Sequence, residues 1–308
     1  MKDLIQKALD AISAWISTLL DTIVLAIGEK LAPCVMDCAD MGITIYNGII
    51  GSAIDMLTTN PMSWNTEAWN FIATEVYPVF LLVACPLVAI FWLFRLSAES
   101  MDPKMHGDVR MDTMLFGIIH FSIAEFVTVY ALWIVCALFS FVDLLTGGWV
   151  GNNANISSDL GFETAEVAAL PLLTLFITLL ISFIYLGVLF VVSCVIAYIA
   201  TIRFFKILAM IPFGTLASST IAGTREVSNT ALHFWKYILS VVLEAVVMLL
   251  ILALFSKVQG SLEIIKPSKL PEDYKIIGIL LNRILIAFLC LGGIKSAGSM
   301  LQRAGLGS

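Results

Sequence analysis

Five long apolar runs, separated by polar segments, dominate the hydropathy pattern of this sequence. Each run approaches or exceeds the roughly 20 residues that a helix needs to cross the hydrocarbon core of a bilayer. They lie near residues 72–94, 113–142, 167–201, 232–255 and 276–294. We therefore predict an all-α, polytopic membrane protein with about five transmembrane helices, which form a bundle over residues 71–295.

The first 70 residues follow a different pattern. Apolar residues recur at a spacing near 3.6 over residues 4–27, with polar and charged residues between them, which is typical of an amphipathic helix. We expect this helix to lie at the membrane interface or against a partner. Pro33 is expected to separate it from a second helix over residues 34–58. Three glycines in the second helix would allow another backbone to approach closely: Gly42, Gly48 and Gly51.

The composition agrees with a membrane protein and argues against a nucleic-acid groove. Hydrophobic residues make up 60% of the chain and charged residues 13%, and the mean hydropathy is +0.98. Soluble domains have about 45–50% and about 25%. The net charge is −6 and the 17 Lys and Arg residues are dispersed, so no basic stripe is present. Direct binding of DNA is therefore not expected.

The basic residues are distributed unevenly among the segments that connect the runs. The segments after the first and third runs contain Arg and Lys, whereas residues 143–166 contain neither. Because basic loops stay in the cytoplasm, we predict that residues 1–70 are extracytoplasmic and that residues 296–308 form a cytoplasmic tail. Residues 257–275 conflict with this rule, because they contain four lysines and this topology places them on the extracytoplasmic side.

Three charged residues lie within the apolar runs. Counting along each run places Glu125, Glu244 and Arg283 at a similar depth in the bilayer. A buried unpaired charge costs several kcal/mol, so we expect Arg283 to pair with Glu244 or with Glu125. The alternative is a proton or ion relay through the two glutamates and His120.

The segment between the third and fourth runs combines charged, aromatic and small residues. The sequence Ile-Pro-Phe-Gly at residues 211–214 is expected to break a helix, which makes residues 203–230 an interfacial loop on the cytoplasmic side. Four charged residues of this segment are candidates for partner contact: Arg203, Lys206, Arg225 and Glu226. Its small residues offer a surface for close approach: Ala217, Ser218 and Ala222.

The cysteines and the catalytic motifs carry little information. Four of the six cysteines lie in apolar runs, where a thiol acts as a small hydrophobic group. Cys34 and Cys38 are four residues apart, and packed thiols, a disulfide and a metal site all remain open for them. The sequence contains no nucleophile–base set, phosphate-binding loop or zinc signature, so we predict neither an enzyme nor a cofactor.

The sequence motifs of the third connecting segment resemble those of a known family. Arg-Phe-Phe-Lys at 203–206, Ile-Pro-Phe-Gly at 211–214 and Arg-Glu at 225–226 precede a run that contains an acidic residue. With about five spans, this layout resembles the TrbL-like membrane subunit of conjugative type IV secretion systems, most of all the short Gram-positive forms. Longer relatives have soluble extensions that this chain lacks, so contacts mapped to those extensions cannot be transferred.

The resemblance implies a non-enzymatic core subunit of a DNA-transfer channel in the bacterial plasma membrane. Such a subunit forms or scaffolds the translocation base among membrane lipids, assembles with itself in a ring and contacts other secretion subunits, including cytoplasmic ATPases. The translocated DNA is an indirect partner in this interpretation, and direct contact between DNA and this chain remains open.

Two other functions remain open at this point. One is a transporter or channel for small solutes or ions that uses Glu125 and Glu244. The other is a phage-type or toxin-type membrane protein. Genes for secretion ATPases and a peptidoglycan hydrolase beside this one would favour the secretion channel.

Overall fold

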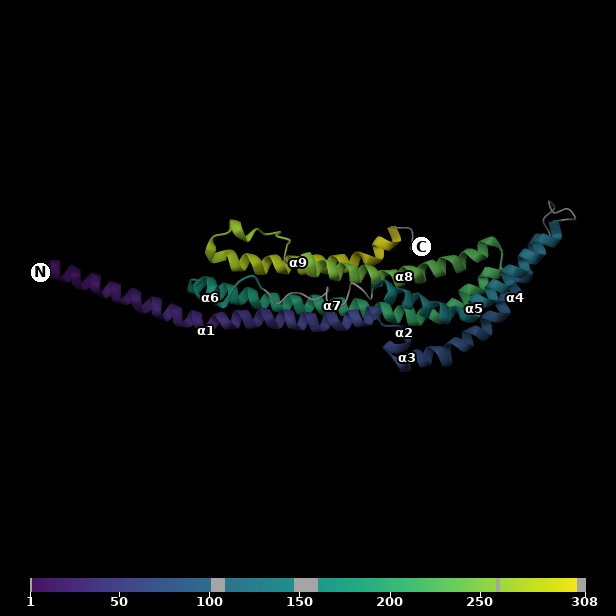
Figure 1. Ribbon diagram of the computed structural model, residues 1–308, viewed down its shortest axis with the longest axis horizontal. Coiled ribbons are helices and arrows are strands. Elements are labelled where there is room, and N and C mark those ends of the chain that lie inside the picture. The colour runs from purple at the N-terminus through teal and green to yellow at the C-terminus, as the bar shows by residue number, and fades with distance from the viewer. Residues whose placement is uncertain (1, 101–108, 147–159, 259–260, 304–308) are drawn as a thin grey trace. The chain divides into compact units, whose positions relative to one another are not determined.

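The computed structural model describes residues 2–100, 109–146, 160–258 and 261–303, and every regular element in these ranges is a helix (Figure 1). The long helices are α1 (Lys2–Thr58), α4 (Tyr77–Ser100), α5 (Val109–Thr146), α7 (Leu172–Ser219), α8 (Arg225–Val258) and α9 (Lys275–Arg303). The short ones are α2 (Pro61–Trp64), α3 (Thr66–Asn70), η1 (Phe71–Val76), α6 (Thr164–Ala168), η3 (Thr220–Ala222), η4 (Pro267–Lys269) and η5 (Glu272–Tyr274).

Five stretches of helix are long and apolar enough to cross a membrane. They are Thr66–Glu99, Leu115–Thr146, Leu172–Ala222, Arg225–Val258 and Glu272–Leu301. The protein is therefore a multi-pass membrane protein, and the predicted all-α fold with five spans is confirmed. The last span belongs to α9, which continues to Arg303, so the first part of the predicted tail is helical.

The N-terminal helix differs from the prediction. α1 is one helix of 57 residues with Pro33 inside it, so the expected break at Pro33 is wrong. A proline removes one hydrogen bond from a helix, but Ala32 and Val35 on either side are fully buried and hold the helix in place. The side chains of residues 2–21, on which the prediction of an amphipathic helix depends, lie outside the described part.

Helix α7 also continues through a predicted break. It extends for 48 residues to Ser219 and contains Pro212, so the predicted interfacial loop is reduced to the short η3 turn before α8. Pro212 leaves the carbonyl of Leu208 without its usual helical donor. Such prolines are tolerated in membrane helices whose surroundings compensate the backbone. Around Pro212 the helix is packed into the bundle, since Ile211 and Thr215 are at most 1% exposed.

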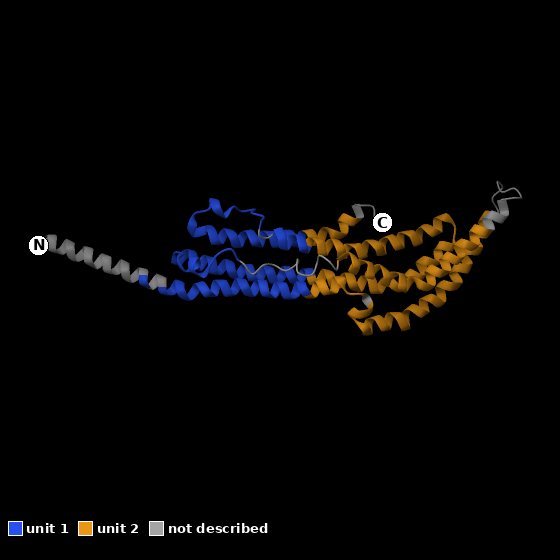
Figure 2. Ribbon diagram, in the orientation of Figure 1, with its two compact units in different colours: residues 1–51, 153–196, 252–292 blue, residues 52–152, 197–251, 293–308 orange. Residues whose placement is uncertain are grey.

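The chain divides into two compact units (Figure 2). Unit 1 consists of residues 1–51, 153–196 and 252–292, and unit 2 consists of residues 52–152, 197–251 and 293–308. Several long helices contribute to both units.

In unit 1, one face of α1 packs against α7, α8 and α9. The buried residues recur every three or four positions: Ala32, Val35, Ala39, Ile43, Tyr46 and Ile50, each at most 2% exposed. Gly42 allows the contact with α7, since a Cβ there would lie 3.2 Å from the Leu186 Cα. The Ser182 hydroxyl of α7 donates to the Val35 carbonyl at 2.8 Å. Close packing therefore fixes α1 in the bundle.

The segment before α9 is tied to unit 1 by one side chain of α9. The Asn282 Oδ1 accepts hydrogen bonds from the backbone N–H groups of Ile264 and Ile265, at 2.9 and 3.2 Å. Its Nδ2 donates to the Leu262 carbonyl at 2.8 Å. One buried amide thus satisfies three backbone groups of this segment.

In unit 2, aromatic side chains and hydroxyls connect the spans. The Tyr77 hydroxyl at the start of α4 donates to the carbonyls of Thr128 and Val129 in α5, at 3.2 and 3.0 Å. Between α7 and α8, the Trp235 Nε1 donates to the Ser218 hydroxyl at 3.1 Å. The turn between these two helices is packed into the unit, because Ala222 is fully buried in a cluster with Val88 of α4 and Ala124 of α5.

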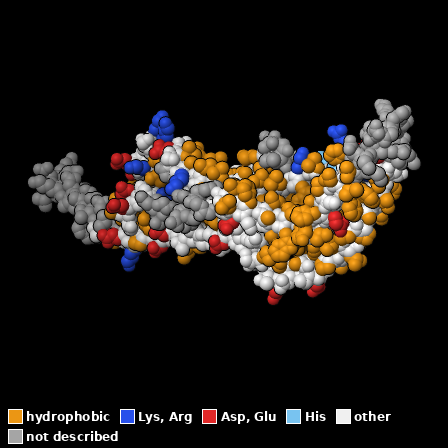
Figure 3. Space-filling view, turned by 45° about the vertical axis from the view of Figure 1, so that its right-hand side comes forward, with side chains coloured by type: hydrophobic (Ala, Val, Ile, Leu, Met, Phe, Trp, Pro, Cys, Tyr) orange, Lys and Arg blue, Asp and Glu red, His pale blue; other side chains and the backbone are white. Residues whose placement is uncertain are grey.

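The outward faces of the spans are apolar. On α4 and α5 the exposed side chains include Leu82, Phe94, Phe126, Trp133 and Leu144. On the face in Figure 3, hydrophobic side chains cover much of unit 2, and most of the visible Lys, Arg, Asp and Glu side chains gather over unit 1. Contiguous apolar surface of this extent is rare on soluble proteins and is what a helix shows to lipid.

Candidate functional site: polar groups within the apolar helices

Arg203 lies within the third candidate span and is only 3% exposed. Its Nε donates to the Val241 carbonyl of α8 at 2.6 Å, and its Nη2 donates to the Val242 carbonyl at 3.0 Å. The guanidinium carbon also lies 5.9 Å from the centre of the Phe139 ring, within the range of a cation–π contact. The expectation that Arg203 contacts a partner is therefore corrected, because its donors are used inside the bundle.

Glu244 follows Val241 and Val242 by three and two positions on α8 and is half-buried. Its carboxylate packs against α9, where a Cβ added to Gly298 would come within 3.0 Å of the Glu244 Oε1. Arg203 is close enough to interact electrostatically with Glu244. Both neighbours belong to unit 2. Glu244 thus sits beside a buried cation in a space that only a glycine on α9 leaves open.

Glu125 of α5 is half-buried in the same unit. It lies beside the Cys85 thiol of α4, within reach of a hydrogen bond. His120 lies five positions earlier on α5, and its Nδ1 is 2.8 Å from the Phe116 carbonyl. A hydrogen bond at this contact requires Nδ1 to carry the hydrogen, because a carbonyl can only accept. The relay that would join the two residues to Glu244 stays a prediction.

Arg283 belongs to unit 1, whereas the two glutamates belong to unit 2. Arg283 is 9% exposed, and it interacts with the hydroxyl of Tyr185, a fully buried residue of α7. Asp40 of α1 also contributes to the electrostatics at Tyr185. The pairing of Arg283 with Glu244 or Glu125 stays a prediction, and the neighbour found for Arg283 is a tyrosine.

The remaining charged candidates of the third connecting segment lie on the surface. Lys206, Arg225 and Glu226 are exposed, so they are available to a partner. The small residues of this segment are less accessible to a partner. Ser218 and Ala222 are buried within unit 2, and Ala217 is half-buried. The small residues predicted to allow close approach therefore pack against other helices of the same chain.

The three glycines of α1 that were predicted to allow close approach fall into two groups. Gly42 packs against the backbone of α7, as described above. No atom lies within 4 Å of a Cβ placed at Gly48 or Gly51. Cys34 and Cys38, on the same helix, are free thiols. Burial, with smaller contributions from Cys34 and Asp37, raises the pKa of the Cys38 thiol and so makes it less reactive near neutral pH.

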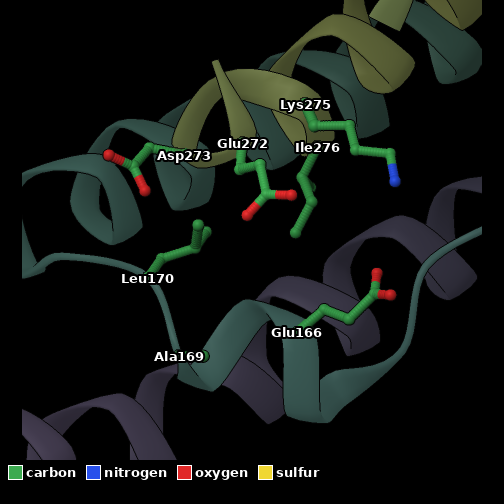
Figure 4. A pocket seen from close by; sticks show the side chains of 7 residues that line it. All are labelled: Glu166, Ala169, Leu170, Glu272, Asp273, Lys275 and Ile276. Atoms are coloured by element: carbon green, nitrogen blue, oxygen red, sulfur yellow. The ribbon is translucent and has the colours of Figure 1, made fainter. Parts of the chain in front are cut away.

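An acidic cavity of 270 Å³ lies in unit 1 between the α6 region and the start of α9 (Figure 4). Glu166 of α6 and Glu272 and Asp273 of η5 line it, together with Lys275. Among the described residues, no group of three or more His, Cys, Asp or Glu side chains is arranged to hold a metal ion.

Comparison of the chain with protein-family models, with curated proteins and with solved structures finds no match. The functional argument therefore depends on the residues and their geometry.

Sequence reasoning missed several of these contacts, and only some of them left a signal. The buried face of α1 is visible in the sequence as apolar residues spaced by three and four from Ala32 to Ile50. The hydrogen bonds of Arg203 left none, since their acceptors are backbone carbonyls almost 40 positions away in the chain.

Proposed function

We propose that this chain is a structural core subunit of a conjugative type IV secretion channel in the bacterial plasma membrane. It would form or scaffold the translocation base, with its N-terminus outside and its C-terminus in the cytoplasm. The proposal is supported by the sequence motifs within residues 203–226 and by the five candidate spans. The observation that carries it is the contrast between the outward faces of the helices in unit 1.

In unit 1, α1 exposes mainly polar side chains, with Met41 as an apolar exception, and its neighbours expose apolar ones. On α1 the outward residues include Asp37, Asp40 and Thr44. On α7 and α9 they include Leu173, Phe176, Phe183, Phe288 and Leu289. The apolar faces suit lipid, whereas carboxylates are costly there. α1 is not among the candidate spans found in the described part of the chain, and its polar outward face suits contact with a further protein subunit or with an aqueous region beside the spans.

The second support is the exposed charge of Lys206, Arg225 and Glu226. In the proposed topology this surface faces the cytoplasm, where a secretion ATPase would contact it. Exposed charges at an interface contribute mainly to the register and rate of association. The outward face of α1 is proposed to contact other copies of the chain, in a ring, or other channel subunits.

The proposal is tested by conjugative transfer of an element that carries this gene. The double variant Asp37→Lys, Thr44→Lys is expected to lower transfer by at least about 100-fold, because reversed charge at an interface costs several kcal/mol. Its level in the membrane should stay unchanged, since both side chains are exposed. The conservative variant Asp37→Asn, Thr44→Ser serves as the matched control and should transfer far better.

The rival function, a transporter or channel that uses Glu125, predicts a different sensitivity. Glu125→Gln removes the charge and keeps the shape, and it should affect transfer only mildly in a scaffold subunit. Transfer that persists in the lysine double variant and is lost with Glu125→Gln would contradict the scaffold and support the transporter.

A further inference from the structure

A second cavity lies in unit 2 where α4, α5 and the η3–α8 turn meet. Its volume is 370 Å³, and its polar lining includes Arg95 from α4, His120 from α5 and Arg225 from α8. Two arginines from different helices therefore line the same cavity.

The arginine of α4 is held in place by a neighbour one turn away. The Arg95 Nε donates to the Glu99 Oε1 at 2.8 Å, with 17% and 26% of the two side chains exposed. This contact leaves the two terminal nitrogens of the guanidinium, which can form a fork with a planar or tetrahedral oxyanion. Glu99 also lines the cavity, but its charge is balanced by Arg95. The charge of Arg225 is left in excess.

The start of α8 adds further donors at the same place. α8 is 34 residues long and begins at Arg225. The first backbone N–H groups of a helix have no acceptor within it and favour an anion. Thr224 and Ser228 line the cavity beside them, and the Ser228 hydroxyl already donates to the Arg225 carbonyl at 3.1 Å. The lining thus offers cationic and backbone donors, with the Thr224 side chain beside them, to one acceptor-rich group.

The cavity lies at the level where apolar spans end. Arg95 is near the end of the first candidate span, His120 near the start of the second and Arg225 at the start of the fourth. Ile221, which lines the cavity, packs on the same buried cluster as Trp92 and Phe121, whose ring centres are 5.4 Å apart. Basic side chains above aromatic ones mark the headgroup region of a bilayer.

We propose that this cavity binds the phosphate group of an anionic phospholipid. The phosphate would be held by the guanidinium groups of Arg95 and Arg225 and by the first turn of α8. The acyl chains would follow the exposed apolar surface of the neighbouring spans, where Phe94 and Phe116 are 64% and 60% exposed. The proposal goes beyond a role in DNA transfer and does not depend on it.

The experiment measures binding by the detergent-purified full chain as a shift in its thermal unfolding midpoint. Titration with phosphatidylglycerol should raise the midpoint, whereas phosphatidylcholine should not. Arg225→Gln should weaken the apparent affinity for phosphatidylglycerol by at least about tenfold, since one hydrogen bond between charged groups is lost. Arg225 is exposed, so this variant should fold.

Lys257→Gln is the matched control, because it removes one exposed positive charge at the other end of α8. Its affinity should equal that of the unchanged chain. Arg95→Lys, which keeps the charge and loses the fork, should weaken binding as well. Equal losses in Arg225→Gln and Lys257→Gln, or equal shifts with the two lipids, would overturn the proposal. Stabilisation by glycerol phosphate equal to that by the lipid would assign the cavity to a soluble phosphate ester and overturn it too.

Discussion

Arg203 and Arg283 are both buried within apolar candidate spans, but their guanidinium groups meet different kinds of neighbour. Arg203 donates to two backbone carbonyls of α8, and Glu244 contributes only at longer range. Arg283 interacts with the side chain of Tyr185. The difference shows that a cation inside a membrane bundle can be stabilised by main-chain dipoles, without a carboxylate at hydrogen-bonding distance.

A carbonyl in the middle of a helix can accept a second hydrogen bond, because its oxygen has two lone pairs and the helix uses one. The forked guanidinium of Arg203 reaches two consecutive carbonyls, which a single ammonium group cannot do in the same way. The requirement at position 203 is therefore for the shape of the donor group. At position 283 the requirement is for a positive charge near the Tyr185 hydroxyl.

The largest effect is expected at position 203. Arg203→Lys keeps a buried charge and loses one of two charged hydrogen bonds, so the free energy of unfolding should fall by about 1.5–3 kcal/mol. Arg203→Met removes both the charge and its desolvation cost, and it should be less harmful than the lysine variant. Thermal unfolding of the purified variants in detergent measures this order. A lysine variant as stable as the methionine variant would contradict the main-chain account.

A smaller effect is expected in unit 1. Tyr185→Phe removes only the buried hydroxyl near Arg283, which has no partner at hydrogen-bond distance among the described residues, so it should change the free energy of unfolding by at most about 1 kcal/mol. The same measurement on Tyr185→Phe with Arg283→Met should show that the two losses are not additive. Additive losses would mean that the two side chains act independently.

The smallest effect is expected from Glu244. Because the hydrogen bonds of Arg203 do not involve this carboxylate, Glu244→Gln should change the free energy of unfolding by no more than about 0.5–1 kcal/mol. Double-variant cycles can then separate two possible partners. Coupling of Glu244→Gln with Arg203→Met fits the structure, whereas stronger coupling with Arg283→Leu would support the pairing predicted from the sequence.

The spans were predictable and two of the helix boundaries were not, for a physical reason. Hydropathy reports how a segment interacts with lipid, and this interaction alone requires a helix. Pro33 and Pro212 predict breaks because a proline weakens a helix locally. Each helix continues because residues beside the proline are buried against other helices, and such tertiary contacts are not contained in the local sequence.

Among the polar contacts, too, some features could be predicted from the sequence and others could not. The intramembrane charges Glu125, Glu244 and Arg283 were visible because side-chain charge can be read from a sequence. The sequence therefore suggested charge pairs, because the carboxylates of Asp and Glu are acceptors that can be recognised in a sequence. The acceptors that Arg203 uses are main-chain carbonyls, which every residue carries, so nothing in the sequence distinguishes Val241 and Val242 from their neighbours.

The three hydrogen bonds of Asn282 have a consequence for the segment at residues 261–271. This segment is held to α9 at Leu262, Ile264 and Ile265, and Pro267 and Pro271 further restrict its backbone. A molecule that bound to it would meet a surface that is already ordered, and little conformational entropy would be lost on association. In immunological terms, the segment is a preformed conformational epitope, which an antibody raised against the corresponding linear peptide would recognise poorly.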